Sequence, residues 1–389
     1  MLRYLLAILL LSFPYANSRA LPLYQEVKQA TDAYLQQHRQ DEGITAIAIQ
    51  IYTPKLSEMK PVLSGYTDNK KSKKISANNL WQIGSITKSF TAVIILQLEK
   101  EYPGFSIDDP VSKYLPQYPA WGNITLKQLL NMTSGIKEYS YLDEFWRDFA
   151  NHPHRGFTPA EIVDYVYKLP SSVAFAPGQG WLYSNTGYYL LGMIIEKVTG
   201  QTLEEEMKSR FFNLSTLRLM HSYAFVNGYP DYIYKRMVHG YMHITDPEHD
   251  THFPLNTDVT SFPLSWSYAS GNITSTPMNV LMWVKALYTS ATLLTAEQRQ
   301  QLLTCVSMKT GQAVAPGEPQ CFGLGIQKQL APDVYYTYEG STIGYRVLYV
   351  FDPATQMIVV IALNSADSVD HVPQLMKKVI DLIKKHGAI

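Results

Sequence analysis

The chain of 389 residues is 46% hydrophobic and carries 33 basic and 33 acidic residues, so its formal net charge is zero. This length and apolar content suffice for one large domain or two interleaved domains, and they argue against a disordered chain. The balanced charge disfavours a nucleic-acid-binding protein, which normally carries a basic excess.

The first twenty residues have the composition of a signal peptide. Arg3 supplies a short positive region, the apolar run Tyr4–Tyr15 is too short to span a bilayer, and a cleavage site follows Ala20. We expect residues 1–20 to direct export and to be removed, with an uncleaved anchor as the less favoured alternative. No later apolar run is long enough for a membrane helix, so the protein is expected to be periplasmic or secreted, without stable membrane insertion.

Regular elements follow this segment in alternating order. Residues 24–38 are predicted to form a helix with one apolar face. Thr45–Tyr52 alternates and is rich in isoleucine, which predicts a strand, and Val62–Tyr66 is its expected hairpin partner. The next predicted helix, Ser85–Lys100, is apolar almost all round and therefore belongs in a core.

The middle of the chain is predicted to consist of helices and long loops. Pro159–Lys168 reads as a helix opened by Thr158 as N-cap, and Gly187–Val198 as another that is apolar on nearly every side. The stretch 221–262 is rich in Tyr, His and Pro and lacks periodicity, so we expect it to wall a cleft.

Strand patterns return near the C-terminus. Val334–Tyr338, Arg346–Phe351 and Met357–Leu363 are predicted strands, with the first turn at Gly340–Gly344. Residues 372–383 have one apolar and one charged face, which predicts a closing amphipathic helix.

Strands at both ends and helices between them predict an α+β fold. We expect an antiparallel sheet flanked by the N- and C-terminal helices, with an all-α insertion. The sheet domain would comprise residues 21–104 and 266–389, and the insertion residues 105–265. The active site is expected between the two parts.

Metal binding is not indicated by the cysteines or histidines. Cys305 and Cys321 permit a disulfide in an exported protein, two buried free thiols are the alternative, and the sequence leaves both open. The histidines and acidic residues of 239–252 have a spacing that fits no recognised metal site, so solvated loop side chains are expected. We therefore expect no metal and no organic cofactor.

A Ser-x-x-Lys pattern is the first candidate for catalysis. It occurs three times, at Ser57/Lys60, Ser85/Lys88 and Ser134/Lys137. Positions i and i+3 share a helix face, so a neutral lysine there can accept the serine proton. Only Ser85 follows a glycine and precedes a long apolar helix, although spacing alone indicates no more than a capping serine and a surface lysine.

A second candidate element is Tyr183-Ser184-Asn185. A tyrosine can shuttle a proton between the nucleophile, its base and the leaving group, and an asparagine can bind a substrate amide. The pattern is weak alone, because Ser270-Gly271-Asn272 is a serine version of it.

Three segments together resemble the serine β-lactamase and penicillin-binding protein superfamily, on the branch of class C β-lactamases, D-Ala-D-Ala carboxypeptidases and related esterases. The segments are Gly84–Thr91, Pro177–Tyr188 and Tyr338–Tyr345. Linker segments at 107–111 and 124–135 match as well, and the resemblance spans most of residues 25–385 in the right order.

This resemblance implies a role for each matched residue. Ser85 would be the nucleophile, Lys88 its base and Tyr183 the proton-transfer partner. Asn185 would contact the acyl-side amide of the substrate, and the backbone N–H groups of Ser85 and Ser341 would form the oxyanion hole. The implied reaction is acyl transfer to Ser85 followed by hydrolysis.

The third segment departs from the family pattern. The family usually has Lys or His where this chain has Tyr338, followed by a small residue where it has Glu339, and that cation receives a substrate carboxylate. We hypothesise that Arg346 supplies the missing cation, or that the substrate has no carboxylate. Tyr338, Gly340, Ser341 and Arg346 are therefore expected to line the substrate site.

The function expected from the sequence is that of an exported serine hydrolase acting on a D-Ala-D-Ala-like peptide, a β-lactam or a small ester. We favour a D-Ala-D-Ala carboxypeptidase or β-lactamase-like enzyme. A small-ester esterase, and a non-catalytic scaffold that binds cell-wall peptide, are the alternatives. The chain contains no Gly-x-Ser-x-Gly elbow, which disfavours an α/β-hydrolase. The expected partner is a small molecule or a peptidoglycan peptide, with no nucleic acid.

Overall fold

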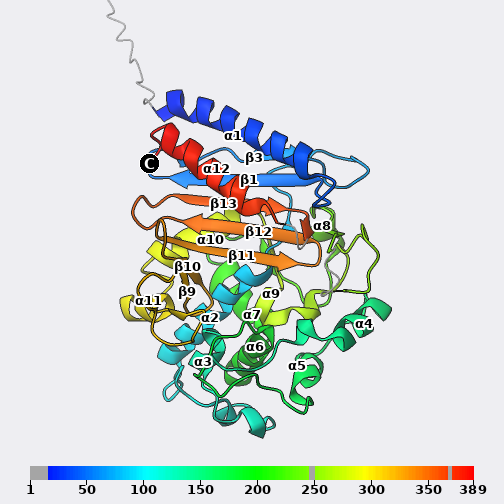
Figure 1. Cartoon of the computed structure of the whole chain (residues 1–389), viewed down its shortest axis with the longest axis vertical. Coiled ribbons are helices and arrows are strands. Elements are labelled where there is room, and N and C mark those ends of the chain that lie inside the picture. The colour runs from blue at the N-terminus through cyan, green and yellow to red at the C-terminus, as the bar shows by residue number, and fades with distance from the viewer. Residues whose placement is uncertain (1–15, 245–249, 367–369) are drawn as a thin grey trace, which may run out of the picture.

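The computed structural model describes residues 16–244, 250–366 and 370–389 (Figure 1). The expected signal segment 1–20 therefore lies mostly outside the described residues. Helix α1 (Ala16–His38) begins inside that segment and crosses the expected cleavage point after Ala20.

An antiparallel sheet of nine strands forms the centre of the fold. Its strands are β1 (Ala46–Thr53), β2 (Ser57–Glu58), β3 (Val62–Gly65), β8 (Val306–Ser307), β9 (Gln320–Phe322), β10 (Gln327–Gln329), β11 (Tyr335–Thr342), β12 (Tyr345–Phe351) and β13 (Ile358–Leu363). The order is β2-β1-β13-β12-β11-β10-β9-β8, with β3 also paired to β1. The first long strand thus pairs with the last, with Ile49 opposite Ile361, so the chain termini meet in one sheet.

Helices cover both faces of this sheet. Terminal helices α1 and α12 (Val372–Lys385) lie together on one face, as Figure 1 shows in blue and red. Ile47 and Ile49 point into this layer, while Ala46 and Ala48 point the other way, as strand alternation requires. The opposite face packs against α10 (Pro277–Thr289), a helix that the sequence analysis did not pick out.

The middle of the chain forms a mostly helical block below β11 in Figure 1. Its helices include α3 (Leu126–Leu130), α4 (Asp143–Asn151), α5 (Pro159–Tyr167), α6 (Asn185–Thr199), α7 (Leu203–Met207) and α8 (Asp231–Tyr234). Two short strands interrupt it: β5 (Ser222–Ala224) pairs with β7 (Ile273–Ser275), and β6 (Tyr241–Met242) with β14 (Ser365–Ala366). The stretch is therefore not wholly helical, because its loops add strands to small sheets.

Local signals placed most elements correctly. Helix α5 begins at Pro159 with Thr158 as N-cap in a capping box, as predicted. The turn predicted at Gly340–Gly344 is present but shorter, at residues 343–344, because β11 pairs with β12 as far as Thr342 opposite Tyr345. Gly340 therefore lies within a strand, where glycine permits close approach of another backbone.

Cys305 and Cys321 form a disulfide that joins the segment after α11 (Ala296–Leu303) to β9.

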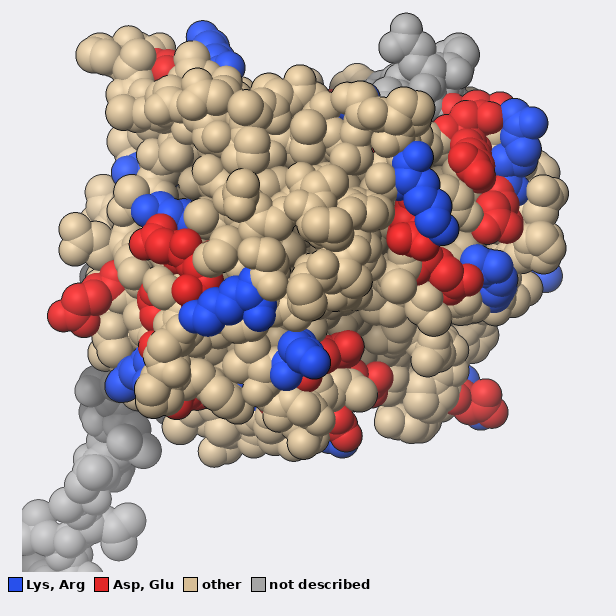
Figure 2. Space-filling model, turned by 90° about the horizontal axis from the view of Figure 1, so that it is seen from below, with Lys and Arg blue, Asp and Glu red and all other residues tan. Residues whose placement is uncertain are grey.

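Among the described helices, none combines the length and apolar character needed to cross a membrane. Figure 2 shows acidic and basic side chains intermingled on the face below the helical block, in keeping with the zero net charge.

Candidate active site

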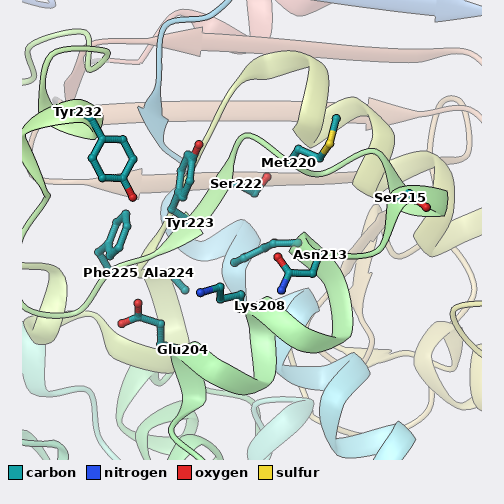
Figure 3. A pocket seen from close by; sticks show the side chains of 11 residues that line it. Glu204, Lys208, Asn213, Ser215, Met220, Ser222, Tyr223, Ala224, Phe225 and Tyr232 are labelled. Atoms are coloured by element: carbon teal, nitrogen blue, oxygen red, sulfur yellow. The ribbon is translucent and has the colours of Figure 1, made fainter.

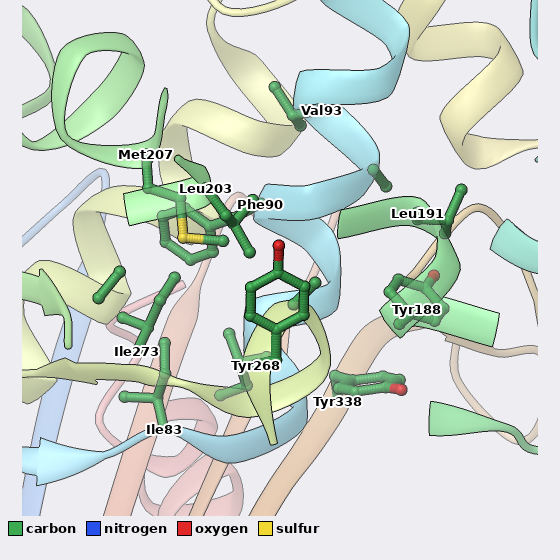
Figure 4. Packing of buried hydrophobic residues seen from close by; sticks show 14 of the residues in the cluster. Ile83, Phe90, Val93, Tyr188, Leu191, Leu203, Met207, Tyr268, Ile273 and Tyr338 are labelled. Atoms are coloured by element: carbon green, nitrogen blue, oxygen red, sulfur yellow. The ribbon is translucent and has the colours of Figure 1, made fainter. Parts of the chain in front are cut away.

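Ser85 lies in a short 3₁₀ turn, Gly84–Ile86, between strand β4 (Trp81–Gln82) and helix α2 (Thr87–Glu101). The sequence predicted that the helix begins at Ser85, and the α-helical part starts two residues later. Helix α2 is buried through most of its length, with Phe90 and Val93 in the apolar cluster of Figure 4. Ser85 itself is only partly buried, so its hydroxyl remains accessible at the end of a rigid element.

The structure brings Ser85, Lys88 and Tyr183 together. Lys88 Nζ lies 2.9 Å from Ser85 Oγ, and Tyr183 Oη lies 2.6 Å from the same oxygen. Lys88 lies about one helical turn after Ser85, so the i, i+3 spacing places the two side chains on the same face. A nucleophile with two proton-transfer groups in hydrogen-bonding reach is the arrangement that nucleophilic catalysis by serine needs.

Lys88 is fully buried, and its environment prepares it to act as a base. Burial lowers its pKa to about 7, while the charge of Glu138 opposes part of that shift. Nζ also donates to Asn185 Oδ1 at 2.6 Å and to the carbonyl oxygen of Ser270 at 3.0 Å. These contacts fix the amine beside Ser85, and the lowered pKa populates its neutral form near pH 7.

Glu138 is a site residue that the sequence analysis missed. It is 2% exposed and accepts hydrogen bonds from Asn185 Nδ2 at 3.0 Å and from the backbone N–H of Asn185. Asn185 thus links Glu138 to Lys88 and positions the amine. Asn185 Nδ2 carries a second hydrogen, which could serve the expected contact with substrate. No motif pointed to Glu138, because its role depends on a contact across 47 residues of sequence.

Ser270 begins the serine version of the Tyr183-Ser184-Asn185 pattern, and the structure places it in the same site. It belongs to the short helix α9 (Tyr268–Gly271), and its backbone carbonyl accepts from Lys88. The Ser270 hydroxyl points instead to the carbonyl of Ser267. Its contribution is therefore made by the backbone, which residue identity does not reveal.

Two glycines bring the proposed oxyanion donors close. Gly84 has a φ of +49°, and a Cβ there would stand 2.6 Å from the backbone nitrogen of Ser341. A Cβ on Gly340 would stand 2.9 Å from the backbone nitrogen of Ser85 and still closer to Ile83. Only glycine permits this backbone-to-backbone contact. It brings the backbones of the Ser85 and Ser341 segments close together, as the expected oxyanion hole would require.

Tyr338 lies against the catalytic group from strand β11. It is 4% exposed, its pKa is raised well above the usual value by burial, and its hydroxyl has no hydrogen-bond partner among the described residues. The ring stacks loosely with Phe322, which in turn contacts Trp181. Trp181, Phe322 and Tyr338 thus form a series of aromatic contacts that ends near Tyr183.

Arg346 is not brought to this site, which corrects the expectation that it replaces the missing cation. It lies directly opposite Ser341 in the sheet, but its side chain points to the α1/α12 face. There it pairs with Glu42 and, at 2.8 Å, with Asp370. Glu339 points to the same face, where burial and the nearby Asp370 raise its pKa to about 7. Neither charge therefore lies beside the nucleophile.

Part of the stretch 221–262, which was predicted to wall a cleft, lines a surface pocket that is separate from the Ser85 site. A surface pocket of about 360 Å³ lies between β5, α7 and α8, with Phe225 and Tyr232 at one end (Figure 3). Ser85, Lys88 and Tyr183 are not among its lining residues. Of the loop histidines, His239 pairs with Asp258, and His252 pairs with Asp143 and Asp250, while 245–249 lie outside the described residues.

Most of the chain matches a known family. The model of the Beta-lactamase family matches residues 31–379, which include every residue of this site. Penicillin-binding protein 4* of Bacillus subtilis (strain 168) is 27% identical over 301 residues, covering 74% of this chain and 61% of that protein. Teichoic acid D-alanine hydrolase of Staphylococcus aureus is 30% identical over 227 residues, 56% of this chain and 48% of that protein. The chain thus spans less than two thirds of the length of these relatives.

Solved structures share the fold over nearly the whole chain. The D-amino acid amidase of Ochrobactrum anthropi SV3 superposes with a TM-score of 0.78 at 24% identity, covering 94% of this chain and 99% of that one. A penicillin-binding protein of Bacillus halodurans gives a TM-score of 0.70 at 22% identity, covering 90% and 99%. The α+β arrangement predicted from the sequence is therefore confirmed.

Proposed function

We propose that this chain, which belongs to the Beta-lactamase family, is an exported hydrolase that forms an acyl-enzyme on Ser85 and favours substrates without a carboxylate at the leaving end. The observation that carries the reaction is the contact of Ser85 Oγ with both Lys88 Nζ and Tyr183 Oη. Lys88 would accept the serine proton, and Tyr183 would pass it to the leaving group. The N–H groups of Ser85 and Ser341 would stabilise the oxyanion.

The substrate preference rests on the charges around Ser85. Among the described residues, Lys88 is the basic side chain in contact with Ser85. Its Nζ already donates to three protein oxygens. Tyr338 occupies the place of the usual cation, and Arg346 faces the other side of the sheet. A terminal carboxylate bound here would lose its hydration without gaining an opposite charge, which is unfavourable. An amide or ester group needs only hydrogen bonds.

The names of two relatives point to the chemical class. One is a D-amino acid amidase and another a teichoic acid D-alanine hydrolase, so both concern D-amino acids. We therefore favour amides or esters of D-alanine-like acyl groups. A D-Ala-D-Ala carboxypeptidase or β-lactamase activity is the second candidate, and the pattern shared with penicillin-binding relatives favours it.

A matched pair of substrates tests this preference. N-acetyl-D-alanyl-D-alanine and its C-terminal amide differ only in the charge at the leaving end, so kcat/KM for the two isolates that charge. We expect the amide to be preferred by about tenfold or more, since one charged contact contributes about 1.5–3 kcal/mol. Preference for the free acid would overturn the neutral-substrate proposal and favour a carboxypeptidase, while leaving Ser85 as the nucleophile.

Replacing Tyr338 should move this preference in a defined direction. Tyr338→Lys should raise the acid-to-amide ratio of kcat/KM about 10- to 100-fold, because it adds a cation where relatives carry one. Tyr338→Phe is the matched control, since it keeps the ring but removes the hydroxyl, and it should lower both rates by a similar factor. An unchanged ratio in Tyr338→Lys would show that this position does not face the leaving group.

Export is proposed from the character of residues 1–20, and the Cys305–Cys321 disulfide supports it, because such bonds persist in oxidising compartments. We expect the protein in the periplasm or the medium to begin after Ala20. The intact mass of protein recovered from each fraction checks this, and full-length protein in the membrane fraction would indicate the uncleaved anchor.

A further inference from the structure

A buried cluster of two histidines and a glutamate lies on the α1/α12 face of the sheet. His38 is the last residue of α1, Glu42 follows in the loop to β1, and His371 stands immediately before α12. One ligand atom from each lies within 4.8 Å of the others, and among the described residues this is the one group of three or more potential ligands so placed. The two imidazole rings stack with centroids 4.2 Å apart, and Nδ1 of His38 and of His371 lie 3.8 Å and 3.2 Å from Glu42 Oε1.

The contact between His371 and Glu42 does not have the geometry of a hydrogen bond. His371 Nδ1 lies 3.2 Å from Glu42 Oε1, yet it is buried without a partner in hydrogen-bonding geometry. Two atoms bound to one zinc ion at about 2.0–2.1 Å in tetrahedral geometry stand about 3.3 Å apart. The observed separation therefore fits two ligands of one ion, and the contact itself lacks hydrogen-bond geometry.

Outer partners hold two of the three ligands in place. Tyr34 donates to Glu42 Oε1 at 2.6 Å, and Arg346 holds the second carboxylate oxygen. Asp41 lies 2.9 Å from Nδ1 of His38, a carboxylate–histidine contact that would support metal binding through the other ring nitrogen, Nε2. Arg346 also pairs with Asp370, so two carboxylates share one guanidinium, and Asp41 adds a third carboxylate beside His38. A divalent cation would add positive charge to this group.

The geometry points to a zinc-type metal site at His38, Glu42 and His371 that joins α1 to α12. Imidazole and carboxylate ligands together suit Zn²⁺ among the common cations. The cluster borders a groove of about 420 Å³ between the two helices, lined by Gln37 and Gln374 among others, which leaves room for water as the fourth ligand. The site lies across the sheet from Ser85, so its role is structural and independent of the proposed hydrolase activity.

Zinc alone is the probe that tests this site. The full-length protein is dialysed against a chelator and titrated with ZnCl₂ by calorimetry, and its melting temperature is followed in parallel. We expect one ion per chain and a rise of about 3 °C or more at a hundredfold excess over Kd. His38→Gln and His371→Gln should each weaken binding at least about 100-fold and abolish the thermal shift.

His386→Gln is the matched control. His386 also connects α12 to α1, through a 3.1 Å contact with Glu26, but it lies outside the cluster, so zinc binding should be unchanged. Should the ligand variants fold poorly, Asp41→Ala at the exposed edge should still lower zinc affinity about 10-fold or more. The proposal is overturned if the wild type binds no stoichiometric zinc, or if both histidine variants bind as it does. Hydrolysis at Ser85 should not respond to the chelator, which separates this test from that of the proposed function.

Discussion

Ser85→Ala should lower hydrolysis of a p-nitrophenyl ester by about 10⁴-fold or more and abolish any covalent adduct. The reason is that Ser85 Oγ contacts both Lys88 Nζ and Tyr183 Oη, the two groups placed to move the serine proton. Intact-protein mass spectrometry after incubation with the ester, and separately with a fluorescent penicillin, measures the adduct directly.

The control for this variant comes from the same sequence. Ser57 starts another Ser-x-x-Lys pattern, but it is exposed in strand β2, so Ser57→Ala should keep wild-type rates. A stable penicillin adduct on the wild type only would indicate a penicillin-binding peptidase, and turnover without adduct a β-lactamase. An adduct that persists in Ser85→Ala would refute the assignment of the nucleophile. Neither adduct nor hydrolysis of any ester or amide would favour the non-catalytic scaffold.

Lys88→Met should lower kcat by about 10²- to 10⁴-fold, the usual contribution of a general base. Methionine fills a similar volume in a fully buried position, so the change removes the amine with little loss of packing. Lys60→Met is the control, because Lys60 belongs to the Ser57 pattern and is exposed. Equal rates for Lys88→Met and the wild type would exclude Lys88 as the base.

The pH profile of the wild type carries the same prediction in another form. The active form of Lys88 is the neutral amine, and burial lowers its pKa to about 7. Below that pH the amine is protonated and cannot accept the serine proton, so kcat/KM should fall about tenfold per pH unit on the acid side. Above it the rate should level off. A profile that is flat between pH 5 and 8 would contradict a lysine base with this pKa.

Sequence alone determined the features that depend on near neighbours. The capping box of Thr158 starts α5, alternation defines β1, and the i, i+3 spacing sets Lys88 beneath Ser85. These patterns act over one or two turns of chain, so they persist in whatever tertiary structure forms. Strand patterns at both ends of the chain predicted the α+β arrangement, and the family resemblance added the order of the three motifs.

Tertiary structure alone decided the features that join distant segments. Glu138 and the Ser270 carbonyl reach Lys88 only because separate helices pack around α2. The face to which Arg346 points depends on strand register, since a slip of one residue turns every side chain to the other side of a sheet. The cluster of His38 with His371 spans nearly the whole chain. Such contacts arise from packing and loop closure over long separations, about which local spacing carries no information.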